Sequence, residues 1–329
     1  MIRVGIIGMG KMGRIRYDTI AEGGHGRVVA ATDPDPLRLA NLGDIRLHST
    51  ASELIANPDV QAVFVCTPNY LNQPLTIQAL RNGKHVFCEK PPAFTGAGVE
   101  EVIAAEATAG KKLMYGFNHR HHESILKAKQ IIDSGVYGRI LWMRGRYGKS
   151  VEHGFYNSWR AKRELAGGGI MLDQGIHMLD LFLMMAGDFD EVHAFVSNLY
   201  WKLDVEDNVF ATLRNKQGVV ASLHSTMTQW RHLFSLEIFL ERGSIIINGL
   251  LTPSGSYGAE AMTITKNRSA PPAATWTQEE DLVFEVDNSW RYEIEHFLHA
   301  IQHDAPIEAG SSRDALKLMR LMDRIYENR

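Results

Sequence analysis

The first thirteen residues constrain the fold of this chain more than any other stretch. Residues 2–7 form a short apolar run rich in Ile and Val, and it leads directly into the pattern Gly8-x-Gly10-x-x-Gly13. The residues behind it, 11–21, are compatible with a helix. A strand, a glycine turn and a helix in that order are the context in which this pattern binds the pyrophosphate of a dinucleotide. Gly8 permits the turn, Gly10 leaves the backbone open to the phosphates, and Gly13 lets the helix pack close to the strand.

The next apolar run supports this interpretation. Residues 28–32 are typical of a second strand, and Asp33 follows it, 33 − 8 = 25 residues after Gly8. An acidic residue roughly 20 positions beyond the glycines binds the ribose hydroxyls of NAD and repels the 2′-phosphate of NADP. We therefore expect NAD, with NADP as the alternative because Arg38 lies near Asp33 in the sequence. The other interpretation is a glycine turn without nucleotide in some other α/β protein. The expected cofactor contacts of this region are Gly8, Gly10, Lys11, Met12, Gly13 and Asp33.

Residues 1 to about 117 alternate between strand and helix patterns. Strands are predicted at 2–7, 28–32, 62–66, 85–88 and 113–117, and helices at 11–21, 35–42, 52–56, 73–82 and 98–109. This alternation predicts a parallel sheet with helices on both faces, and such sheets bind ligands beyond the carboxyl ends of their strands.

Three of these strand ends carry polar residues. Thr67-Pro68-Asn69 is either a plain turn or a wall of the nicotinamide pocket. In Glu89-Lys90-Pro91-Pro92, the lysine is either a solvated turn charge or an ammonium that the two stiff prolines after it aim into a cleft. Asn118 and Arg120 stand in the polar cluster 118–123. We assign further cofactor contacts to Thr67, Pro68, Asn69, Glu89 and Lys90.

The pattern changes near residue 120, so we predict a cofactor domain at 1–120 and a second domain at 121–329. A helix is expected at 123–134, and strands follow one another with short turns at 139–146, 192–200, 209–213, 219–226, 234–240 and 244–247. Residues 253–274 form a long excursion with one strand at 262–265, and helices at 289–303 and 311–326 finish the chain. This order predicts an α+β domain with a large, mostly antiparallel sheet.

The second half also carries a polar constellation. Three glycines, 167–169, lead into a predicted helix at 172–185, on which Asp173 and His177 are spaced i, i+4 and share a face. A His with a carboxylate one turn away is suited to general acid/base catalysis; the alternative is a hydrogen bond inside a buried helix. The residues predicted to contact substrate are Lys90, Asn118, Arg120, Tyr147, Trp159, Arg160, Asp173 and His177.

Composition restricts the remaining choices. The formal net charge of −3 gives no sign of a nucleic acid partner, and no apolar run approaches the roughly 18 residues that span a bilayer. Because the predicted strand starts at residue 2, we expect no signal peptide in this sequence. Two cysteines, Cys66 and Cys88, are expected to be free thiols in a reducing cytoplasm. His119, His121, His122, His153, Asp173 and His177 lack the spacings of known metal motifs, so no metal is predicted.

Four motifs of a known protein family follow one another in this chain. They are Gly8-x-Gly-x-x-Gly13, Thr67-Pro68-Asn69, Glu89-Lys90-Pro91, and Gly167-Gly-Gly with Asp173-x-Gly-x-His177. The sequence resembles the Gfo/Idh/MocA family of oxidoreductases, also called the glucose–fructose oxidoreductase and inositol dehydrogenase family. The resemblance runs through residues 1 to about 185. Two positions depart from it. Asn72 stands where the family often has His, and Arg120-His121-His122-Glu123 replaces the family's Arg-Phe-x-Pro.

The resemblance implies a Rossmann domain and an open-faced second domain, with the substrate between them. It also implies transfer of hydride between nicotinamide and a hydroxyl of a sugar or sugar derivative, with a nucleotide sugar or sugar phosphate suggested by the arginines. Carried over by motif, Lys90 orients the hydroxyl, His177 is the acid/base and Asp173 binds substrate. A homodimer or homotetramer is implied as well. The alternatives are an inositol or cyclitol dehydrogenase, a non-catalytic NAD-binding regulator, and a metal-dependent hydrolase or lyase.

Overall fold

The computed structural model describes residues 1–266 and 275–327, and the chain divides into two compact units. The first comprises Met1–Asn118 and Ser289–Arg320, and the second His119–Asn288 and Leu321–Arg329. The boundary expected at residue 120 lies close to the point where the chain leaves the first unit. The return of Ser289–Arg320 to that unit was not foreseen, because nothing in a helix's own sequence says which sheet it packs on.

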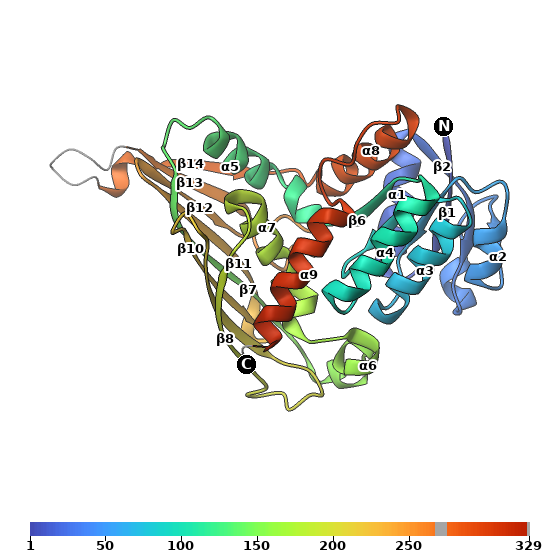
Figure 1. Ribbon diagram of the computed structural model, residues 1–329, viewed down its shortest axis with the longest axis horizontal. Coiled ribbons are helices and arrows are strands. Elements are labelled where there is room, and N and C mark those ends of the chain that lie inside the picture. Colours follow the sequence, from blue (N-terminus) through green and yellow to red (C-terminus); the bar gives the residue numbers. More distant parts are fainter. Residues whose placement is uncertain (267–274, 328–329) are drawn as a thin grey trace. The chain divides into compact units, whose positions relative to one another are not determined.

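The first unit is built on a six-stranded parallel sheet, drawn in blue to cyan in Figure 1. Its strand order, β3-β2-β1-β4-β5-β6, is that of dinucleotide-binding folds, with the order reversing between β1 and β4. Residues near that point at the carboxyl edge are therefore placed to contact a ligand. The strands are β1 Ile2–Ile7, β2 Gly26–Thr32, β3 Arg46–Leu47, β4 Ala62–Val65, β5 His85–Glu89 and β6 Leu113–Gly116.

Helices cover both faces of this sheet, as the alternation predicts. On one face, Phe297 of α8 packs edge-on against Phe64 and Phe87, in a core that α1 shares through Ile20. On the other, α2 and α3 lie on β1 and β5. These helices are α1 Lys11–Gly23, α2 Ala51–Ala56, α3 Asn69–Arg81, α4 Gly96–Ala109 and α8 Ser289–Gln302.

Two predictions of local structure in this unit need correction. Residues 35–42 do not form an α-helix: only a 3-10 turn, η1 Pro36–Leu39, is present, and none of its residues is buried. A stretch without a buried face gains too little from packing to sustain a helix. Helix α3 begins at Asn69, earlier than predicted, and carries Pro74 inside it.

The second unit contains an eight-stranded sheet of order β14-β13-β12-β11-β7-β10-β9-β8. Neighbours are antiparallel except β7 and β10, which are parallel, so the mostly antiparallel sheet is confirmed. The short β14 was not predicted, and part of the excursion at 253–274 lies outside the described residues. The strands are β7 Ile140–Ser150, β8 Glu191–Ser197, β9 Asn208–Arg214, β10 Val220–Thr226, β11 Thr228–Leu240, β12 Gly243–Asn248, β13 Glu260–Lys266 and β14 Glu280–Phe284.

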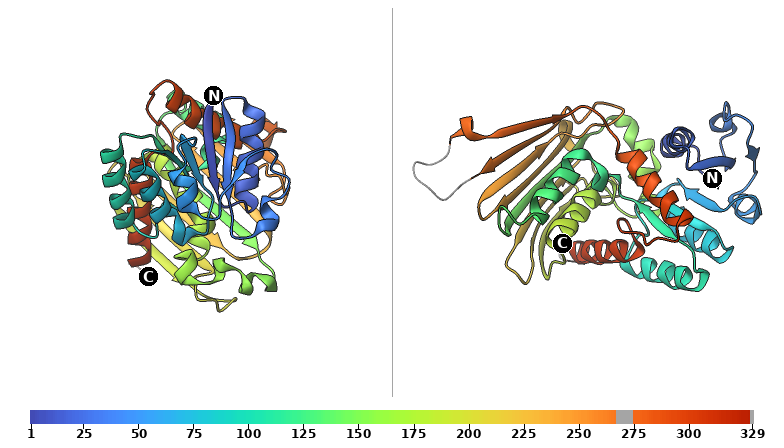
Figure 2. Two further views of the ribbon diagram at one scale, coloured as in Figure 1. Left: turned by 90° about the vertical axis from the view of Figure 1, so that its right-hand side faces the viewer. Right: turned by 90° about the horizontal axis from the view of Figure 1, so that it is seen from above.

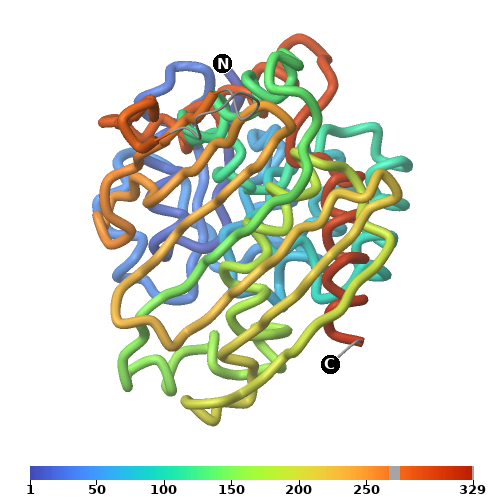
Figure 3. Tube along the Cα trace, turned by 90° about the vertical axis from the view of Figure 1, so that its left-hand side faces the viewer, coloured from blue at the N-terminus to red at the C-terminus, as the bar shows by residue number. Residues whose placement is uncertain are grey.

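One face of this sheet carries α5 Glu123–Asp133 and α7 Ile176–Ala186 (Figure 2). The short α6, Arg163–Ala166, precedes α7 in the chain. Helix α7 lies on β7, where Gly145 allows close approach: a Cβ there would lie 2.4 Å from Met178 and 2.9 Å from Phe182. Figure 3 shows the other face of the strands, over which no helix of the described residues lies. Helix α9, Ser312–Glu327, finishes the chain, with its residues divided between the two units.

The predicted helix at 172–185 begins differently from expectation. Its first turn, Met171–Gly175, is a π-helix, and regular α-helix starts at Ile176. Together with α6, the helical stretch Arg163–Ala186 is long and apolar enough to cross a membrane by composition, but 78% of its most apolar window is buried inside the protein. That burial is the one expected of a core helix.

Candidate functional site

The glycine loop follows β1 at the carboxyl edge of the first sheet. Gly8 has a φ of +89°, and a Cβ there would lie 2.5 Å from the carbonyl oxygen of Cys66. At Gly13 a Cβ would lie 1.9 Å from the carbonyl oxygen of Gly8, so only glycine lets α1 approach β1 so closely. Over Gly10, by contrast, a Cβ would meet only the Arg38 guanidinium tip, at 3.7 Å. The backbone at Gly10 is therefore open on its outer side.

The start of α1 fits a diphosphate. Gly10 caps the helix without a side-chain hydrogen bond, and Lys11 and Met12 form its first turn with no acidic residue among them. The N–H groups of such a turn carry partial positive charge and bind phosphate oxygens. The residues present thus fit the dinucleotide predicted from the sequence.

Asp33 stands directly after β2, beside this loop. Its carboxylate accepts hydrogen bonds from the backbone N–H of Met9 at 2.7 Å and of Asp35 at 2.9 Å. Arg38 extends to within 3.7 Å of the same carboxylate and 3.3 Å of that of Asp35. The acidic group expected to bind the ribose is thus fixed in place, with a guanidinium alongside it.

The ends of β4 and β5 are joined by one buried side chain, Asn72 of α3. Its Nδ2 donates to the carbonyl oxygens of Glu89 at 3.1 Å and Pro91 at 2.9 Å. Its Oδ1 accepts from the hydroxyl of Thr67 at 3.0 Å. Thr67, Pro68 and Asn69, the first residue of α3, therefore lie in a segment that is tied to the turn containing Lys90.

Glu89 and Lys90 diverge in their surroundings. The Glu89 carboxylate is buried and accepts from Nε of Arg16, a fully buried residue of α1, at 2.7 Å. Arg16 in turn contacts Glu293 of α8 at 2.6 Å. Glu89 is thereby part of an internal ion-pair network, which favours a supporting role over direct cofactor binding. Lys90 is only half-buried and is followed by a cis peptide bond to Pro91.

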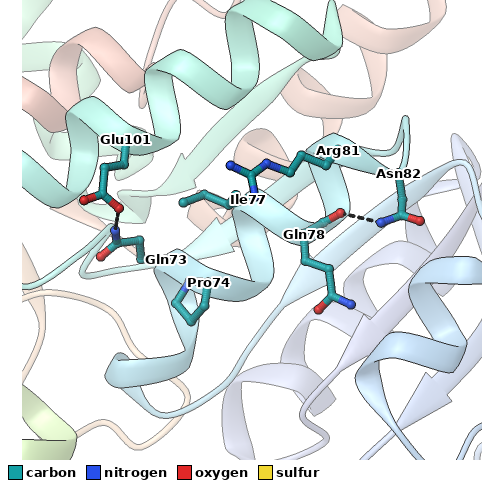
Figure 4. A pocket seen from close by; sticks show the side chains of 7 residues that line it. All are labelled: Gln73, Pro74, Ile77, Gln78, Arg81, Asn82 and Glu101. Atoms are coloured by element: carbon teal, nitrogen blue, oxygen red, sulfur yellow. Dashed lines mark hydrogen bonds between the residues drawn. The ribbon is translucent and has the colours of Figure 1, made fainter.

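Two further features of the first unit complete its description. Asn118, predicted to bind substrate, donates to the Ser289 hydroxyl at 3.3 Å. An open groove of about 550 Å³ runs along α3, with Glu101 of α4 on its rim (Figure 4). Seven residues line it, none of which belongs to the predicted site: Gln73, Pro74, Ile77, Gln78, Arg81, Asn82 and Glu101.

In the second unit, His177 lies in a buried aromatic cluster. Its ring stacks on that of His119, with centroids 3.8 Å apart and planes inclined by 19°. A nitrogen of His119 is hydrogen-bonded to the Tyr147 hydroxyl at 2.7 Å. Burial raises the pKa of Tyr147, so its hydroxyl stays protonated. The Tyr147 ring also lies beside that of Tyr257, with centroids 5.5 Å apart, and the Tyr257 hydroxyl accepts from the amide of Gln174.

Asp173, one π-turn before His177, has cationic partners from other elements. Its carboxylate is hydrogen-bonded to Nζ of Lys149 on β7, and Nε of Arg160 lies 3.9 Å away. The Arg160 guanidinium also lies over the ring of Trp159, at 4.4 Å from its centroid. The structure therefore brings four polar or aromatic side chains together just before α7: Asp173, Lys149, Arg160 and Trp159.

Arg120, also predicted to bind substrate, forms a buried ion pair with Asp180. It is buried, and two of its nitrogens donate to the carboxylate of Asp180 at 2.7 and 2.6 Å. A paired, buried guanidinium of this kind favours a role in holding the start of the unit against α7. His122 is similarly occupied, since its Nδ1 is 2.8 Å from the carboxylate of Glu260.

Within residues 1–266 and 275–327, no group of three or more His, Cys, Asp or Glu side chains is placed to hold a metal ion. Both cysteines are free thiols, and burial raises the pKa of Cys88 to about 12.

The sequence predicted no site role for three residues that contact these groups, Asn72, Arg16 and Lys149. Each makes its contact with a residue at least 17 positions away in the chain, and no short motif contains both partners. For Lys149, one indication was available: the strand predicted at 139–146 continues to Ser150 in the structure, which places Lys149 on β7.

The parallel sheet of the first unit carries an open glycine loop, a fixed acidic residue and a lysine turn at its carboxyl edge. These features are typical of a dinucleotide-binding domain, and an α+β domain accompanies it here. Two family models match the sequence: an oxidoreductase family with an NAD-binding Rossmann fold at residues 2–117, and the GFO/IDH/MocA C-terminal domain at residues 125–246. The chain belongs to the Gfo/Idh/MocA family of oxidoreductases, and its first unit is an NAD-binding domain. The family expected from the motifs is confirmed.

Several individual proteins are similar to the chain at 27% to 29% identity. Levoglucosan dehydrogenase of Pseudarthrobacter phenanthrenivorans is 29% identical over 253 residues, which cover 68% of this chain and 64% of that protein. The chain thus spans less than two thirds of that relative. Myo-inositol 2-dehydrogenase of Thermotoga maritima is 27% identical over 261 residues, or 76% of each. The crystal structure of aldose-aldose oxidoreductase from Caulobacter crescentus, in complex with glycerol, matches with a TM-score of 0.83 and 28% identity over 99% of this chain and 97% of that one.

Proposed function

We propose that this protein is an NAD(P)-dependent oxidoreductase that transfers hydride between nicotinamide and a ring CH–OH group of a sugar. The observation that carries the proposal is the Lys90 turn. Asn72 fixes the backbone on each side of it, at the same sheet edge as the glycine loop and Asp33. Ligands of such sheets bind beyond that edge, so a held ammonium there is suited to a reacting oxygen.

In the oxidative direction, His177 takes the proton from the substrate hydroxyl as a general base. Bound NAD supplies the acceptor for the hydride that leaves the same carbon. Lys90 stabilises the negative charge that develops on the oxygen, and Asp173 accepts a hydrogen bond from a second hydroxyl. The stacked ring of His119 limits the orientations of His177, and Lys149 limits those of Asp173. In the reductive direction, His177 returns the proton.

An uncharged sugar fits the arginines of the second unit better than an anionic one. Arg120 is bonded to the Asp180 carboxylate, Arg160 lies near that of Asp173, and Nε of Arg163 donates to the backbone carbonyl oxygen of Asp204. The sequence comparisons also point to sugars, since levoglucosan dehydrogenase is among the relatives. The second candidate is an inositol, favoured by the likeness to myo-inositol 2-dehydrogenase. Sugar phosphates and nucleotide sugars remain test compounds, because Arg160 is itself partly exposed.

The test is a substrate panel read by the absorbance of reduced nicotinamide. NAD and then NADP are supplied with levoglucosan, free sugars, methyl glucosides, inositols, sugar phosphates and nucleotide sugars. We expect turnover with one neutral class, reduced about 10²-fold or more in Lys90→Met and in His177→Asn. Thermal stabilisation by NAD without turnover of any compound would instead support a non-catalytic NAD-binding regulator. Unchanged turnover in Lys90→Met would refute the role of that lysine.

We also propose that the protein is a homo-oligomer, formed through the open face of the second sheet. Phe195 of β8 and Phe210 of β9 lie opposite each other there and are 77% and 48% exposed. In the same sheet, the rings of Trp142 on β7 and Phe239 on β11 stack on each other with centroids 4.0 Å apart. Apolar patches of this kind are usually covered in solution. Light scattering should show a dimer or tetramer that Phe210→Glu dissociates and Leu126→Glu, on α5, does not. A monomeric wild type would contradict the proposal.

The free thiols favour a reducing compartment, and we propose the cytoplasm. Fractionation of cells that produce the tagged protein tests this directly.

A further inference from the structure

The turn that presents Lys90 is not held by its own residues. Lys90 has a long, flexible side chain, so its reach depends on the direction in which the backbone releases it. The carbonyl groups immediately before and after it, those of Glu89 and Pro91, both accept from the single amide nitrogen of Asn72, at 3.1 and 2.9 Å. These two bonds bracket Lys90 and fix its backbone from both sides.

The amide of Asn72 is suited to this contact by its chemistry. It is fully buried, and its two N–H groups diverge from one nitrogen, so one side chain satisfies both carbonyls. Its oxygen accepts from the Thr67 hydroxyl at 3.0 Å. All three bonds are made without introducing a charge beside the lysine. An aspartate of the same shape has no donor, and a neutral histidine has only one.

The third bond gives the contact a second consequence. Thr67 begins the segment after β4 that is assigned to the cofactor, whereas Glu89–Pro91 follows β5. Asn72 therefore joins the two neighbouring strand ends across which a nicotinamide and a substrate hydroxyl have to be aligned.

We propose that Asn72 is a positioning residue that sets the Lys90 ammonium against the reacting hydroxyl. This inference rests on the proposed function. It adds a residue that makes no contact with substrate and acts only through Lys90.

The test is a double-mutant cycle between Asn72→Leu and Lys90→Met, with the best compound of the substrate panel. Asn72→Leu keeps the volume and removes all three hydrogen bonds. Since misplacement of a reacting group by about 1 Å costs about 10²-fold, we expect kcat to fall about 10²-fold in the wild-type background. In the Lys90→Met background the same substitution should change kcat by no more than about twofold, because the group it positions is gone.

Controls separate positioning from general damage. Asn57→Leu replaces another buried asparagine of the first unit, at the end of α2, and should lower the melting temperature without changing kcat beyond about twofold. The dissociation constant of NAD should remain within about twofold in Asn72→Leu. If that variant does not fold, Asn72→Ser, which keeps one donor, takes its place, with a smaller loss of kcat expected.

The possible results separate a failure of the positioning role of Asn72 from a failure of the proposed function. An equal loss of kcat in both backgrounds, or no loss in Asn72→Leu, would overturn the positioning role while Lys90 keeps its own. Unchanged turnover in Lys90→Met, or no turnover of any panel compound, would overturn the proposed function and this inference with it.

Discussion

The rings of His119 and His177 stack face to face in the second unit, with centroids 3.8 Å apart. His119 is itself held by the Tyr147 hydroxyl at 2.7 Å. A flat ring packed on one side of an imidazole restricts its rotation, and such contacts depend on shape as well as charge. The orientation of His177, the proposed base, is thus set by His119, a residue that the sequence alone offered as a possible metal ligand.

This relationship predicts an asymmetry between two substitutions. His119→Phe keeps a flat ring beside His177, and we expect kcat within about tenfold of wild type, whereas His119→Ala removes the ring and should lower kcat about 10²-fold. Steady-state kinetics with a panel substrate measures both. Equal losses would mean that the hydrogen bond to Tyr147, not the stacking, is what matters.

Arg16 is predicted to be the most sensitive charged residue of the first unit. It is fully buried between Glu89 and Glu293, with the rings of Phe87 and Trp290 at 4.4 and 4.8 Å. Arg16→Met leaves the two carboxylates without their cation, which should lower the free energy of unfolding by about 3–5 kcal/mol. Urea denaturation measures this loss.

The matched control is Arg14→Met, which breaks an exposed pair with Asp18 and should cost less than about 1 kcal/mol. Similar losses in the two variants would show that the buried network contributes little.

Arg38 is predicted to govern the use of NADP. Its guanidinium lies 3.7 Å from Asp33 and over the open side of Gly10, where it can offset repulsion between Asp33 and a 2′-phosphate. Arg38→Ala should lower kcat/KM for NADP about tenfold and leave that for NAD nearly unchanged, since a charge-assisted hydrogen bond contributes about 1.5 kcal/mol. Parallel assays with both cofactors measure the ratio. An equal fall for both would assign Arg38 to the loop's structure instead.

His85 is predicted to make the first unit less stable in mild acid. Its Nδ1 accepts the backbone N–H of Lys112 at 3.1 Å, which requires the neutral ring. Burial, together with the charges of Lys111 and Lys112, lowers the pKa of His85 to about 4. Above about pH 6.5, the ordinary pKa of His, the ring is neutral whether the chain is folded or unfolded. Below it the unfolded chain binds a proton that the folded chain refuses, so stability falls as the pH drops from about 6.5 to about 4.

The measurement is the midpoint of urea unfolding at about pH 7.5 and about pH 5. His85→Gln, whose side-chain oxygen can accept the same N–H, should show a smaller drop between the two. His193→Gln, on the exposed side of β8, should behave as wild type. A wild-type drop in His85→Gln would trace the acid sensitivity to another group.

Much of the fold and of the candidate site was open to prediction from local sequence. The strand before Gly8, the helix that begins at Lys11 and the strand that precedes Asp33 are found where the apolar pattern puts them. Lys90 and His177 were named from short motifs. The predictions of these strands and of this helix are confirmed because hydrophobic periodicity and glycine geometry act over a few residues, within the span that a motif contains. The roles of Lys90 and His177 stay predictions.

Tertiary structure alone decided what surrounds each of those residues. Glu89 and Lys90 are neighbours in one motif, yet Glu89 is bonded to Arg16, 73 positions away, while Lys90 is only half-buried. The bonds of Asn72 to Glu89 and Pro91, the stacking of His119 on His177 and the return of α8 to the first sheet are of the same kind. Each depends on two segments that meet only when the sheet has formed, because a hydrogen bond or a ring contact needs its partner within a few ångströms, whatever the separation along the chain.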